Sequence, residues 1–373
     1  MKTDKSKTLL LILLGIALLA SLMLVALACD DDETAEPTAE EPTAATEGST
    51  APEGTAELPG KGVTVEPAKA TWDTGWFQIE IYIKALEALG YKVEDPVMLE
   101  NQAFYQAVKQ GDVDFWANVW VMLHQPYLKD IEEETTIAGY VAKGGALQGY
   151  LIDKKTADEY GITNLDDFKD PNIAALFDTD GNGKANMVAC PPGWGCELMI
   201  DFHLDAYELT DVIEPIKAEY SVSMADAIAR YQQGESIFFY TWTPNWTVGK
   251  LIPGEDVVWI EVPFPALPEE QQEFLDMVSV PGVEGCVNDP CMMGLVADDL
   301  AVIANNKFLA DNPAAAALFD AMGIPLADIF VQNAKMFDGE DSPEDIVRHA
   351  EEWIEANQTL FDSWIEAALA AAK

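Results

Sequence analysis

Residues 63–119 read VTVEPAKATWDTGWFQIEIYIKALEALGYKVEDPVMLENQAFYQAVKQGDVDFWANV. The β-rich start at 63–71 is followed by a helical pattern that ends at Gly90, and a second strand comes next. Asn101 is expected to cap a short helix, after which residues 113–119 form a buried strand. Strands and helices that alternate over such short connections predict an α/β fold, with a mostly parallel sheet covered by helices.

The same alternation continues toward the C-terminus, which suggests a second sheet of the same kind. The chain has 373 residues, and at roughly 100–200 residues per domain this length indicates two lobes. Strands that cross from one lobe to the other are expected near 148–150 and 262–266. The predicted division is residues 58–147 and 266–373 in lobe I, and residues 148–265 in lobe II.

The charge of the chain is strongly negative. It has 65 Asp and Glu residues against 21 Lys and Arg residues, a formal net charge of −44. This argues against a nucleic-acid partner, because affinity for phosphate backbones comes from Lys and Arg. The ten Trp residues and a hydrophobic share of 49% argue equally against a disordered acidic chain.

The N-terminus carries the pattern of an export signal. Lys residues precede an apolar stretch from Leu9 to Ala28, which predicts a signal peptide over residues 1–28. Cys29 follows directly and resembles the lipid-accepting Cys of a bacterial lipoprotein. An uncleaved membrane anchor is the alternative, since twenty apolar residues could span a bilayer. Both interpretations place the rest of the chain outside the cytoplasm and tether it to a membrane.

A linker is expected between this signal and the folded part. Residues 30–57 contain ten acidic residues, no basic residue and no aromatic residue. Such a segment cannot bury enough apolar surface to offset the entropy of ordering it. We therefore expect residues 29–57 to form a disordered, lipid-anchored acidic linker.

Three Trp-bearing segments carry the candidate chemistry. Trp120 and Trp242 stand where strands should end, and Trp194 stands where a helix should begin. A buried Trp is usually core packing, and the Trp residues expected to be core are Trp246, Trp259, Trp353 and Trp364. Aromatic rings that converge from three loops could instead cage a quaternary ammonium group through cation–π attraction. Secondary candidates to line the same cleft are Trp72, Asp73 and Trp76.

The turn beside Trp194 supplies the opposite polarity. Backbone N–H groups at the start of a helix have no helical partner and carry the positive end of the helix dipole. The N–H groups of Gly195 and Cys196 are therefore candidates to bind a carboxylate. Together with the aromatic rings, they would suit a small zwitterion.

Five strings resemble the glycine betaine/proline betaine substrate-binding protein of ABC importers. They are WDTGWFQ (72–78), QGYLIDKKTAD (148–158), CPPGWGCE (190–197), YTWTPNW (240–246) and NPAAA (312–316). The likeness extends over nearly all of residues 58–373. It implies a two-lobed periplasmic-binding-protein fold of type II that closes on a betaine in the cleft between the lobes. It also implies a monomeric receptor without a cofactor, which delivers its ligand to the permease and ATPase of an importer for osmoprotectant uptake.

The resemblance assigns roles to particular residues. Trp120, Trp194 and Trp242 would box the quaternary ammonium, and His124 would hold the carboxylate together with the N–H groups of Gly195 and Cys196. The chain departs from the family pattern in two places. Residues 121–123 are Val-Met-Leu where the pattern has Thr-Pro-Leu, and the loop 271–299 has no counterpart in it.

Four Cys residues remain after Cys29. They pair most simply by proximity, as Cys190 with Cys196 and as Cys286 with Cys291, and the exported compartment permits both disulfides. A metal site is the competing interpretation, but neither pair has a His at ligand spacing.

A second short motif resembles the start of a calcium loop. Asp178, Asp180 and Asn182 occupy its ligand positions, but position twelve is Ala189 where a bidentate Glu is required. A turn rich in Asx residues and a weak structural calcium site are both compatible with this segment.

No catalytic motif competes with the receptor hypothesis. The chain has no Gly-x-Ser-x-Gly elbow, no phosphate loop and no His-Glu-x-x-His motif, so we expect a protein that is not an enzyme. Two alternatives stay open. One is an exported carbohydrate-active hydrolase whose Trp rings stack on sugars, and the other is a surface lipoprotein whose cage grips choline groups.

Overall fold

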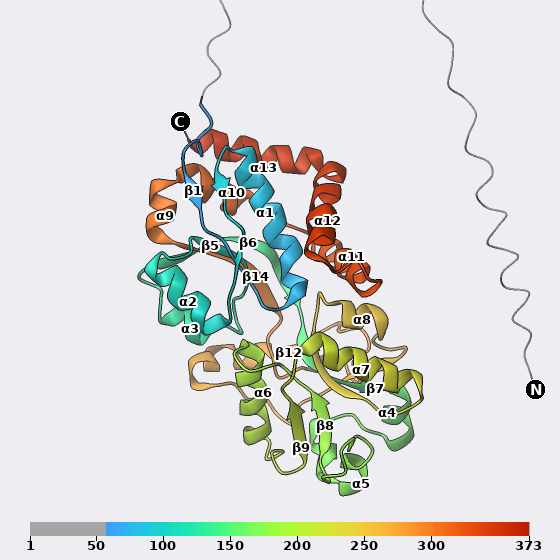
Figure 1. The fold of residues 1–373 in the computed structure, drawn as a ribbon. Helices are drawn as coiled ribbons and strands as arrows, with labels where there is room; N and C mark the ends of the chain where they lie inside the picture. Colours follow the sequence, from blue (N-terminus) through green and yellow to red (C-terminus); the bar gives the residue numbers. More distant parts are fainter. Residues whose placement is uncertain (1–56, 373) are drawn as a thin grey trace, which may run out of the picture. The chain divides into compact units, whose positions relative to one another are not determined.

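The computed structural model describes residues 57–372, so the predicted signal peptide, Cys29 and the linker up to residue 56 lie outside the described residues. The described part of the chain forms one compact unit. Figure 1 shows that this unit has two lobes, each with its own sheet and its own helices.

Lobe I is built around an antiparallel sheet with the strand order β5-β14-β6. Two parallel pairs, β1 with β3 and β2 with β4, belong to the same lobe, and Pro67, just before β2, forms a bridge with Phe115 of β5. The strands are β1 (Thr64–Val65), β2 (Ala68–Lys69), β3 (Lys92–Val93), β4 (Val97–Met98), β5 (Phe115–Trp120), β6 (Thr135–Ala146) and β14 (Asp298–Asn305). The helices are η1 (Asp73–Gly75), α1 (Trp76–Ala88), α2 (Asn101–Gln110), α3 (Gln125–Lys129), α9 (Asn306–Asp311), α10 (Pro313–Ala321), α11 (Leu326–Phe337), α12 (Pro343–Ala356) and α13 (Gln358–Ala371).

Lobe II is built around a five-stranded sheet with the order β11-β7-β10-β8-β9. Its strands are β7 (Gln148–Asp153), β8 (Ala185–Val188), β9 (Ile213–Ile216), β10 (Phe238–Trp242) and β11 (Val257–Ile260). Its helices are α4 (Lys154–Tyr160), η2 (Leu165–Lys169), α5 (Pro171–Ala174), α6 (Gly195–Ala206), α7 (Tyr220–Gln232) and α8 (Trp246–Lys250). The segment that returns to lobe I contains η3 (Glu269–Met277), β12 (Ser279–Val280) and β13 (Cys291–Met292).

Strand direction differs in one respect from the mostly parallel sheets that the alternation predicts. β14 runs antiparallel to β5 and β6, and β7 runs antiparallel to β10 and β11, whereas β8 is parallel to β9 and β10. The reason is topological. β7 and β14 are the strands by which the chain enters a lobe from the other one, so each begins at the junction where the neighbouring strands end.

The loop without a family counterpart extends the sheet of lobe II. Trp259 N–H donates to Gly285 O (3.0 Å), and Val287 N–H donates to Trp259 O (3.2 Å). Residues 285–287 therefore lie along the edge strand β11, and the Cys286–Cys291 disulfide closes the loop beside it. This segment lies against lobe II, whereas the sequence-based boundary at 265/266 assigns it to lobe I.

Helix boundaries follow the local chemistry, with one exception. Gly111 adopts φ +78° and ends α2, as expected, since only glycine enters this region without strain. Ser342 accepts a hydrogen bond from Asp345 N–H and caps α12. The exception is Asn101, which is the first residue of α2 and not its cap. Its side chain turns to His124 instead, so a tertiary contact replaces the predicted cap.

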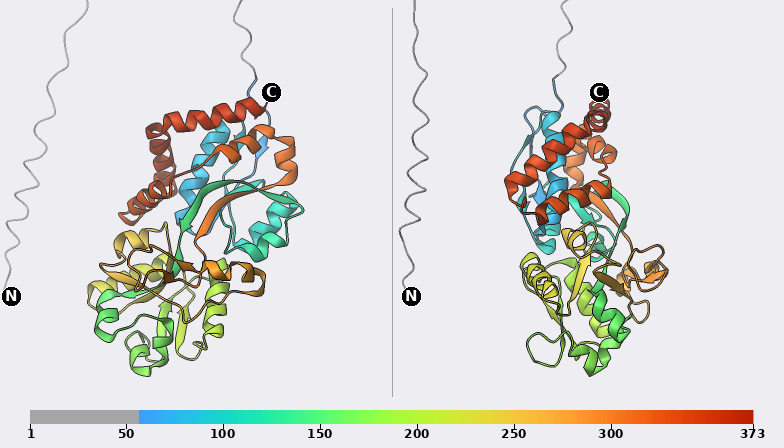
Figure 2. Two further views of the ribbon diagram at one scale, coloured as in Figure 1. Left: turned by 180° about the vertical axis from the view of Figure 1, so that it is seen from behind. Right: turned by 90° about the vertical axis from the view of Figure 1, so that its right-hand side faces the viewer.

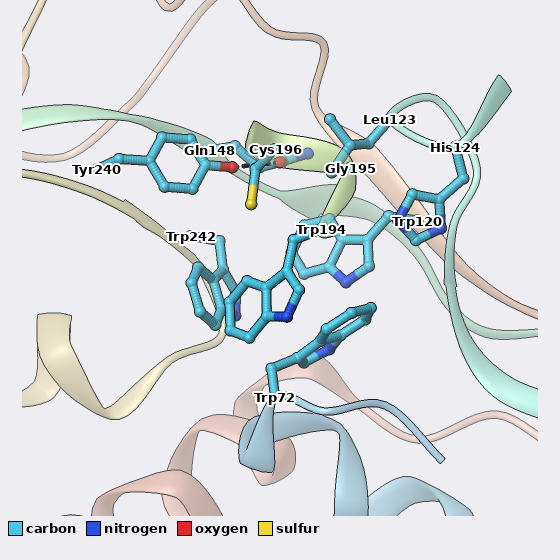
Figure 3. A pocket seen from close by; sticks show the side chains of 10 residues that line it. All are labelled: Trp72, Trp120, Leu123, His124, Gln148, Trp194, Gly195, Cys196, Tyr240 and Trp242. Carbon is cyan, nitrogen blue, oxygen red and sulfur yellow. Dashed lines mark hydrogen bonds between the residues drawn. The ribbon is translucent and has the colours of Figure 1, made fainter. Parts of the chain in front are cut away.

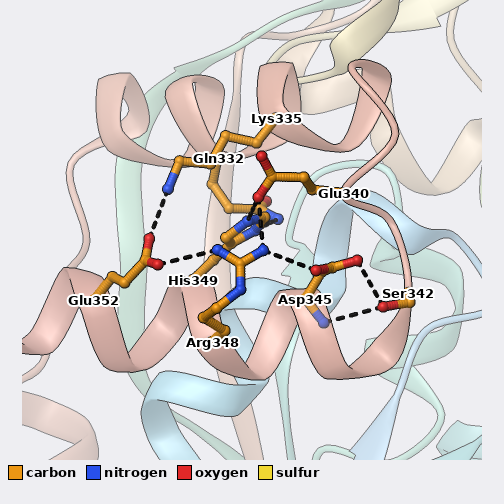
Figure 4. A network of polar contacts seen from close by, with 8 residues as sticks. All are labelled: Gln332, Lys335, Glu340, Ser342, Asp345, Arg348, His349 and Glu352. Atoms are coloured by element: carbon orange, nitrogen blue, oxygen red, sulfur yellow. Dashed lines mark hydrogen bonds and ion pairs between the residues drawn. The ribbon is translucent and has the colours of Figure 1, made fainter. Parts of the chain in front are cut away.

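The C-terminal helices of lobe I are joined by a polar network around Arg348 (Figure 4). Arg348 on α12 bonds to Asp345 (2.7 Å), to Glu340 (2.6 Å) and to Glu352 (3.0 Å). The buried His349 contacts the same Glu340 at 2.9 Å. Glu340 lies in the loop that follows α11, so the network fixes α12 against that loop. Figure 2 shows these helices on the outside of lobe I.

A continuous apolar core runs through the described residues. Its largest fully buried side chains include Trp116 and Tyr105 in lobe I and Trp259 and Tyr150 in lobe II. Among residues 57–372, no single helix has the length and apolar character needed to cross a membrane; by those two criteria alone, only the bent pair of α10 and α11 passes.

Candidate functional site

A small pocket lies where the two lobes meet. Its wall combines strand ends from both sheets: Trp120 ends β5, Gln148 begins β7 and Trp242 ends β10. Figure 3 shows the side chains that line it, with four indole rings grouped together. The lining residues are Trp72, Trp120, Leu123, His124, Gln148, Trp194, Gly195, Cys196, Tyr240 and Trp242.

Trp194 meets two other indole rings of the pocket edge to face. Trp194 lies 5.8 Å from Trp242 and 5.2 Å from Trp72, measured between ring centroids. The ring of Tyr220 contacts the ring of Trp242 with a centroid distance of 4.7 Å. All of these rings are buried. A cation placed among such desolvated faces would be attracted to each of them.

The start of α6 forms the polar side of the pocket. Trp194 is the N-cap residue and makes no side-chain cap, so Gly195 and Cys196 provide the first two N–H groups of the helix. The Cys190–Cys196 disulfide ties this turn together. A Cβ atom on Gly195 would come within 2.8 Å of the His124 ring, so only glycine lets the helix start approach lobe I this closely.

His124 is buried in the pocket wall, and both of its ring nitrogens already have partners. Asn101 Nδ2 lies 2.9 Å from Nε2, and the Tyr105 hydroxyl lies 2.8 Å from Nδ1. Burial lowers the pKa of His124 to about 3, so the imidazole is neutral at physiological pH. With Asn101 donating to Nε2, the ring proton sits on Nδ1 and points to Tyr105.

The turn that leads into His124 is held by the segment that returns from lobe II. The carboxylate of Asp298 accepts hydrogen bonds from the N–H groups of Met122 (2.8 Å) and Leu123 (3.0 Å). Gln271 Nε2 donates to Met122 O at 2.7 Å. Burial raises the pKa of Asp298 to about 7, although the backbone hydrogen bonds oppose this shift. The two departures from the family pattern, 121–123 and 271–299, therefore contact each other.

The family of the chain follows from comparison with known proteins. Residues 63–356 match the family model described as the substrate-binding domain of ABC-type glycine betaine transport systems. This match covers more than half of the chain. The chain belongs to this family.

Known relatives align with this substrate-binding domain over nearly their whole length. The domain is 43% identical over 318 residues to the glycine betaine-binding periplasmic protein of Dickeya dadantii, and this alignment covers 85% of this chain and 93% of the relative. It is 44% identical over 319 residues to the glycine betaine/proline betaine-binding periplasmic protein of Escherichia coli, with 85% and 94% covered. Because such relatives are periplasmic binding proteins, this substrate-binding domain is extracytoplasmic.

Solved structures share the fold of this substrate-binding domain. The glycine betaine/L-proline-binding protein of Borrelia burgdorferi superimposes with a TM-score of 0.64 at 17% identity, covering 83% of this chain and all of that chain. The closed lactococcal glycine betaine complex gives a TM-score of 0.60 at 17% identity, covering 81% and 99%. The fold is thus the two-lobed, type II periplasmic-binding-protein fold that the sequence predicts.

The structure brings all six predicted ligand-binding residues to one pocket: Trp120, His124, Trp194, Gly195, Cys196 and Trp242. Of the secondary candidates, Trp72 lines the pocket. Asp73 and Trp76 do not, and the Trp76 indole N–H donates to Ala70 O instead (2.8 Å).

Sequence reasoning missed three lining residues, Leu123, Gln148 and Tyr240. Tyr240 had a signal, because it precedes Trp242 by two positions and alternate residues of a strand share a face. Its hydroxyl donates to Gln148 Oε1 at 2.6 Å, so Gln148 joins the pocket through a contact between two strands that are 92 residues apart.

The calcium-like loop binds its own backbone. Asp178 accepts hydrogen bonds from the N–H groups of Gly181 (2.7 Å) and Gly183 (2.8 Å), and these contacts lower its pKa. Asn182 Nδ2 donates to Asp180 at 3.1 Å. Among residues 57–372, no group of three or more His, Cys, Asp or Glu side chains is placed to hold a metal ion. These contacts form an Asx-rich turn.

Proposed function

We propose that this protein is the extracytoplasmic receptor of an ABC importer and that it captures glycine betaine or proline betaine for osmoprotectant uptake. The observation that carries the proposal is the convergence of Trp120, Trp194 and Trp242 on one buried pocket beside the first N–H groups of α6. Membership of the glycine betaine family and the names of the relatives support it.

The cation end of the ligand would sit among the Trp rings. A quaternary ammonium has no N–H group, so it cannot donate hydrogen bonds and gains most from aromatic faces. Each desolvated ring contributes about 2 kcal/mol, so three rings approach the ~8 kcal/mol of a micromolar complex before association costs.

The carboxylate would bind to the N–H groups of Gly195 and Cys196 at the positive end of α6. A contact from His124 to the carboxylate needs the proton on Nε2, and this requires Asn101 Nδ2 to give up its present hydrogen bond. The Tyr105 hydroxyl would then donate to Nδ1.

The partners of the receptor follow from the same proposal. The two lobes would close on the betaine, and the closed form would dock as a monomer on the permease and ATPase complex. A lipid on Cys29, or an uncleaved N-terminal anchor, would keep the receptor near the membrane. We propose no catalytic role for any residue.

Titration calorimetry on the folded domain tests the ligand class. We expect glycine betaine to bind with a dissociation constant in the micromolar range or below, choline to bind more weakly because it has no carboxylate, and a neutral sugar not to bind. Sugar binding without betaine binding would support the hydrolase alternative and exclude this proposal. Choline binding as tight as glycine betaine binding would exclude the carboxylate site.

The substitution Trp194→Ala tests the cage in the same experiment. One ring contributes about 2 kcal/mol to the binding free energy, so its removal should weaken glycine betaine binding by at least about tenfold. Trp259→Phe is the matched control, because Trp259 is buried in lobe II and does not line the pocket. Unchanged affinity in Trp194→Ala would show that the ring is not part of the binding site.

A further inference from the structure

Two rings of the proposed cage are hydrogen-bonded to the opposite lobe. The indole N–H of Trp194 donates to Thr71 Oγ1 at 2.8 Å, and the indole N–H of Trp242 donates to Thr74 Oγ1 at 3.3 Å. Trp194 and Trp242 belong to lobe II, whereas Thr71 and Thr74 lie in lobe I just before α1. Both bonds therefore exist only where the lobes are in contact.

The hydrogen bonds around Thr71 leave its hydroxyl oxygen free to accept a hydrogen bond from Trp194. Its hydroxyl proton points to Glu100, whose Oε2 accepts it at 3.2 Å, so an oxygen lone pair is left for the indole of Trp194. Glu100 also lies next to Gly193, in the turn that precedes Trp194. These contacts connect the start of α6 in lobe II with Glu100, the N-cap residue of α2 in lobe I.

Trp72 stands between the two threonines in the sequence and packs on the same cage. Its ring meets Trp194 edge to face at 5.2 Å, and its own indole N–H donates to Asn118 at 2.7 Å. A third bond between the lobes lies beside it, where the Ser221 hydroxyl donates to Asp73 at 3.4 Å. The segment 71–74 thus contacts lobe II along its whole length.

We propose that Thr71 and Thr74 are positioning residues for the betaine site: their hydroxyls fix the planes of Trp194 and Trp242 and so complete the cage when the lobes close. This inference rests on the proposed function. A cation–π contact depends on the ring face being turned to the cation, so a ring free to rotate would lose part of its contribution. Because the bonds form only on closure, their loss should speed ligand release more than it slows capture.

The test compares Thr71→Val and Thr74→Val with Thr71→Ser and Thr74→Ser. Valine keeps the shape of threonine without the acceptor, and serine keeps the acceptor. We expect each Val variant to bind glycine betaine about three- to tenfold more weakly, from the worth of one hydrogen bond, mainly through a faster dissociation rate in stopped-flow Trp fluorescence. The Ser variants should stay within about twofold of the wild type, and the melting temperature without ligand should change little in all four.

Several results would overturn the inference. Val variants that bind like the wild type, or Ser variants that bind as weakly as the Val variants, would show that the hydroxyls do not position the rings. A wild-type protein that binds no betaine would instead remove the proposed function, and this inference with it. If a Val variant does not fold, hydrogen exchange of the indole N–H groups in wild-type protein labelled with ¹⁵N-Trp tests the inference instead. The Trp194 and Trp242 indole N–H groups should exchange with solvent more slowly when betaine is bound, and equal exchange with and without ligand contradicts the proposal.

Discussion

Asp298 shows how a single buried side chain can support the candidate pocket without lining it. It accepts two backbone N–H groups of the turn before His124, and burial holds its pKa at about 7, above the ordinary value of 3.8. The folded state therefore keeps a proton on Asp298 over a range of pH in which the unfolded state has lost it. By linkage, the contribution of Asp298 to stability is present at low pH and is lost as the pH rises from about 4 to 7.

The substitution Asp298→Asn should remove this pH dependence. We expect the free energy of unfolding of the wild type to fall more steeply than that of the variant between pH 4 and 7, by up to about 1.4 kcal/mol per pH unit. Urea unfolding at several pH values measures the two slopes. Asp205→Asn, at an exposed position, is the control and should keep the wild-type slope. Parallel curves for Asp298→Asn and the wild type would show that Asp298 ionises in the folded state as it does in the unfolded state.

At the level of single residues, only part of the site could be predicted from the sequence. Trp120, Trp194 and Trp242 were predictable because strand ends and helix starts are local patterns. The partners of His124 were not, since Asn101 and Tyr105 lie 23 and 19 residues away and meet it only after α2 has packed on β5. The hydrogen bond from Met122 N–H to Asp298 joins residues 176 positions apart, and no local pattern indicates it.

At the scale of elements, the two disulfides offer a matched comparison. Cys190–Cys196 closes the turn that presents Trp194 and the first N–H groups of α6, whereas Cys286–Cys291 closes a loop beside β11. Their loops are nearly equal in length, with sequence separations of 6 and 5. A loop of this length is expected to stabilise the fold by about 2.4 kcal/mol in the loop-entropy model. The two bonds should therefore contribute similarly to stability and differently to binding.

Replacement of each Cys pair by Ser tests this difference. Both double variants should lose about 2 kcal/mol in the free energy of unfolding. Only Cys190→Ser with Cys196→Ser should also weaken glycine betaine binding, by several fold, because the turn beside Trp194 becomes less ordered before the ligand binds. Unfolding and calorimetry on the same samples measure both effects. Equal affinities in the two variants would mean that the first disulfide serves stability alone.

At the scale of the whole molecule, the two lobes and their alternating elements follow from the sequence, but the path between them does not. The hydrophobic pattern predicts a strand at 150–152, within β7, but it does not predict β14, and only the packed lobes show that both strands begin at the junction and run against their neighbours. The loop 285–287 is a similar case. It joins the edge of β11 through backbone hydrogen bonds, which depend on position and not on side-chain type.

The folded part of the molecule also carries a large negative charge. Residues 58–373 contain 54 acidic and 18 basic residues, so the folded part carries about −36. Such a charge repels itself and destabilises the compact state, and added salt screens it, since the Debye length falls from about 10 Å at 0.1 M to about 3 Å at 1 M. We expect the free energy of unfolding to rise by at least about 1 kcal/mol over this range. The affinity for glycine betaine should change little, because a zwitterion has no net charge for the field to attract. Urea unfolding and calorimetry in NaCl measure the two quantities, and a stability that is indifferent to salt would show that the acidic surface is not under self-repulsion.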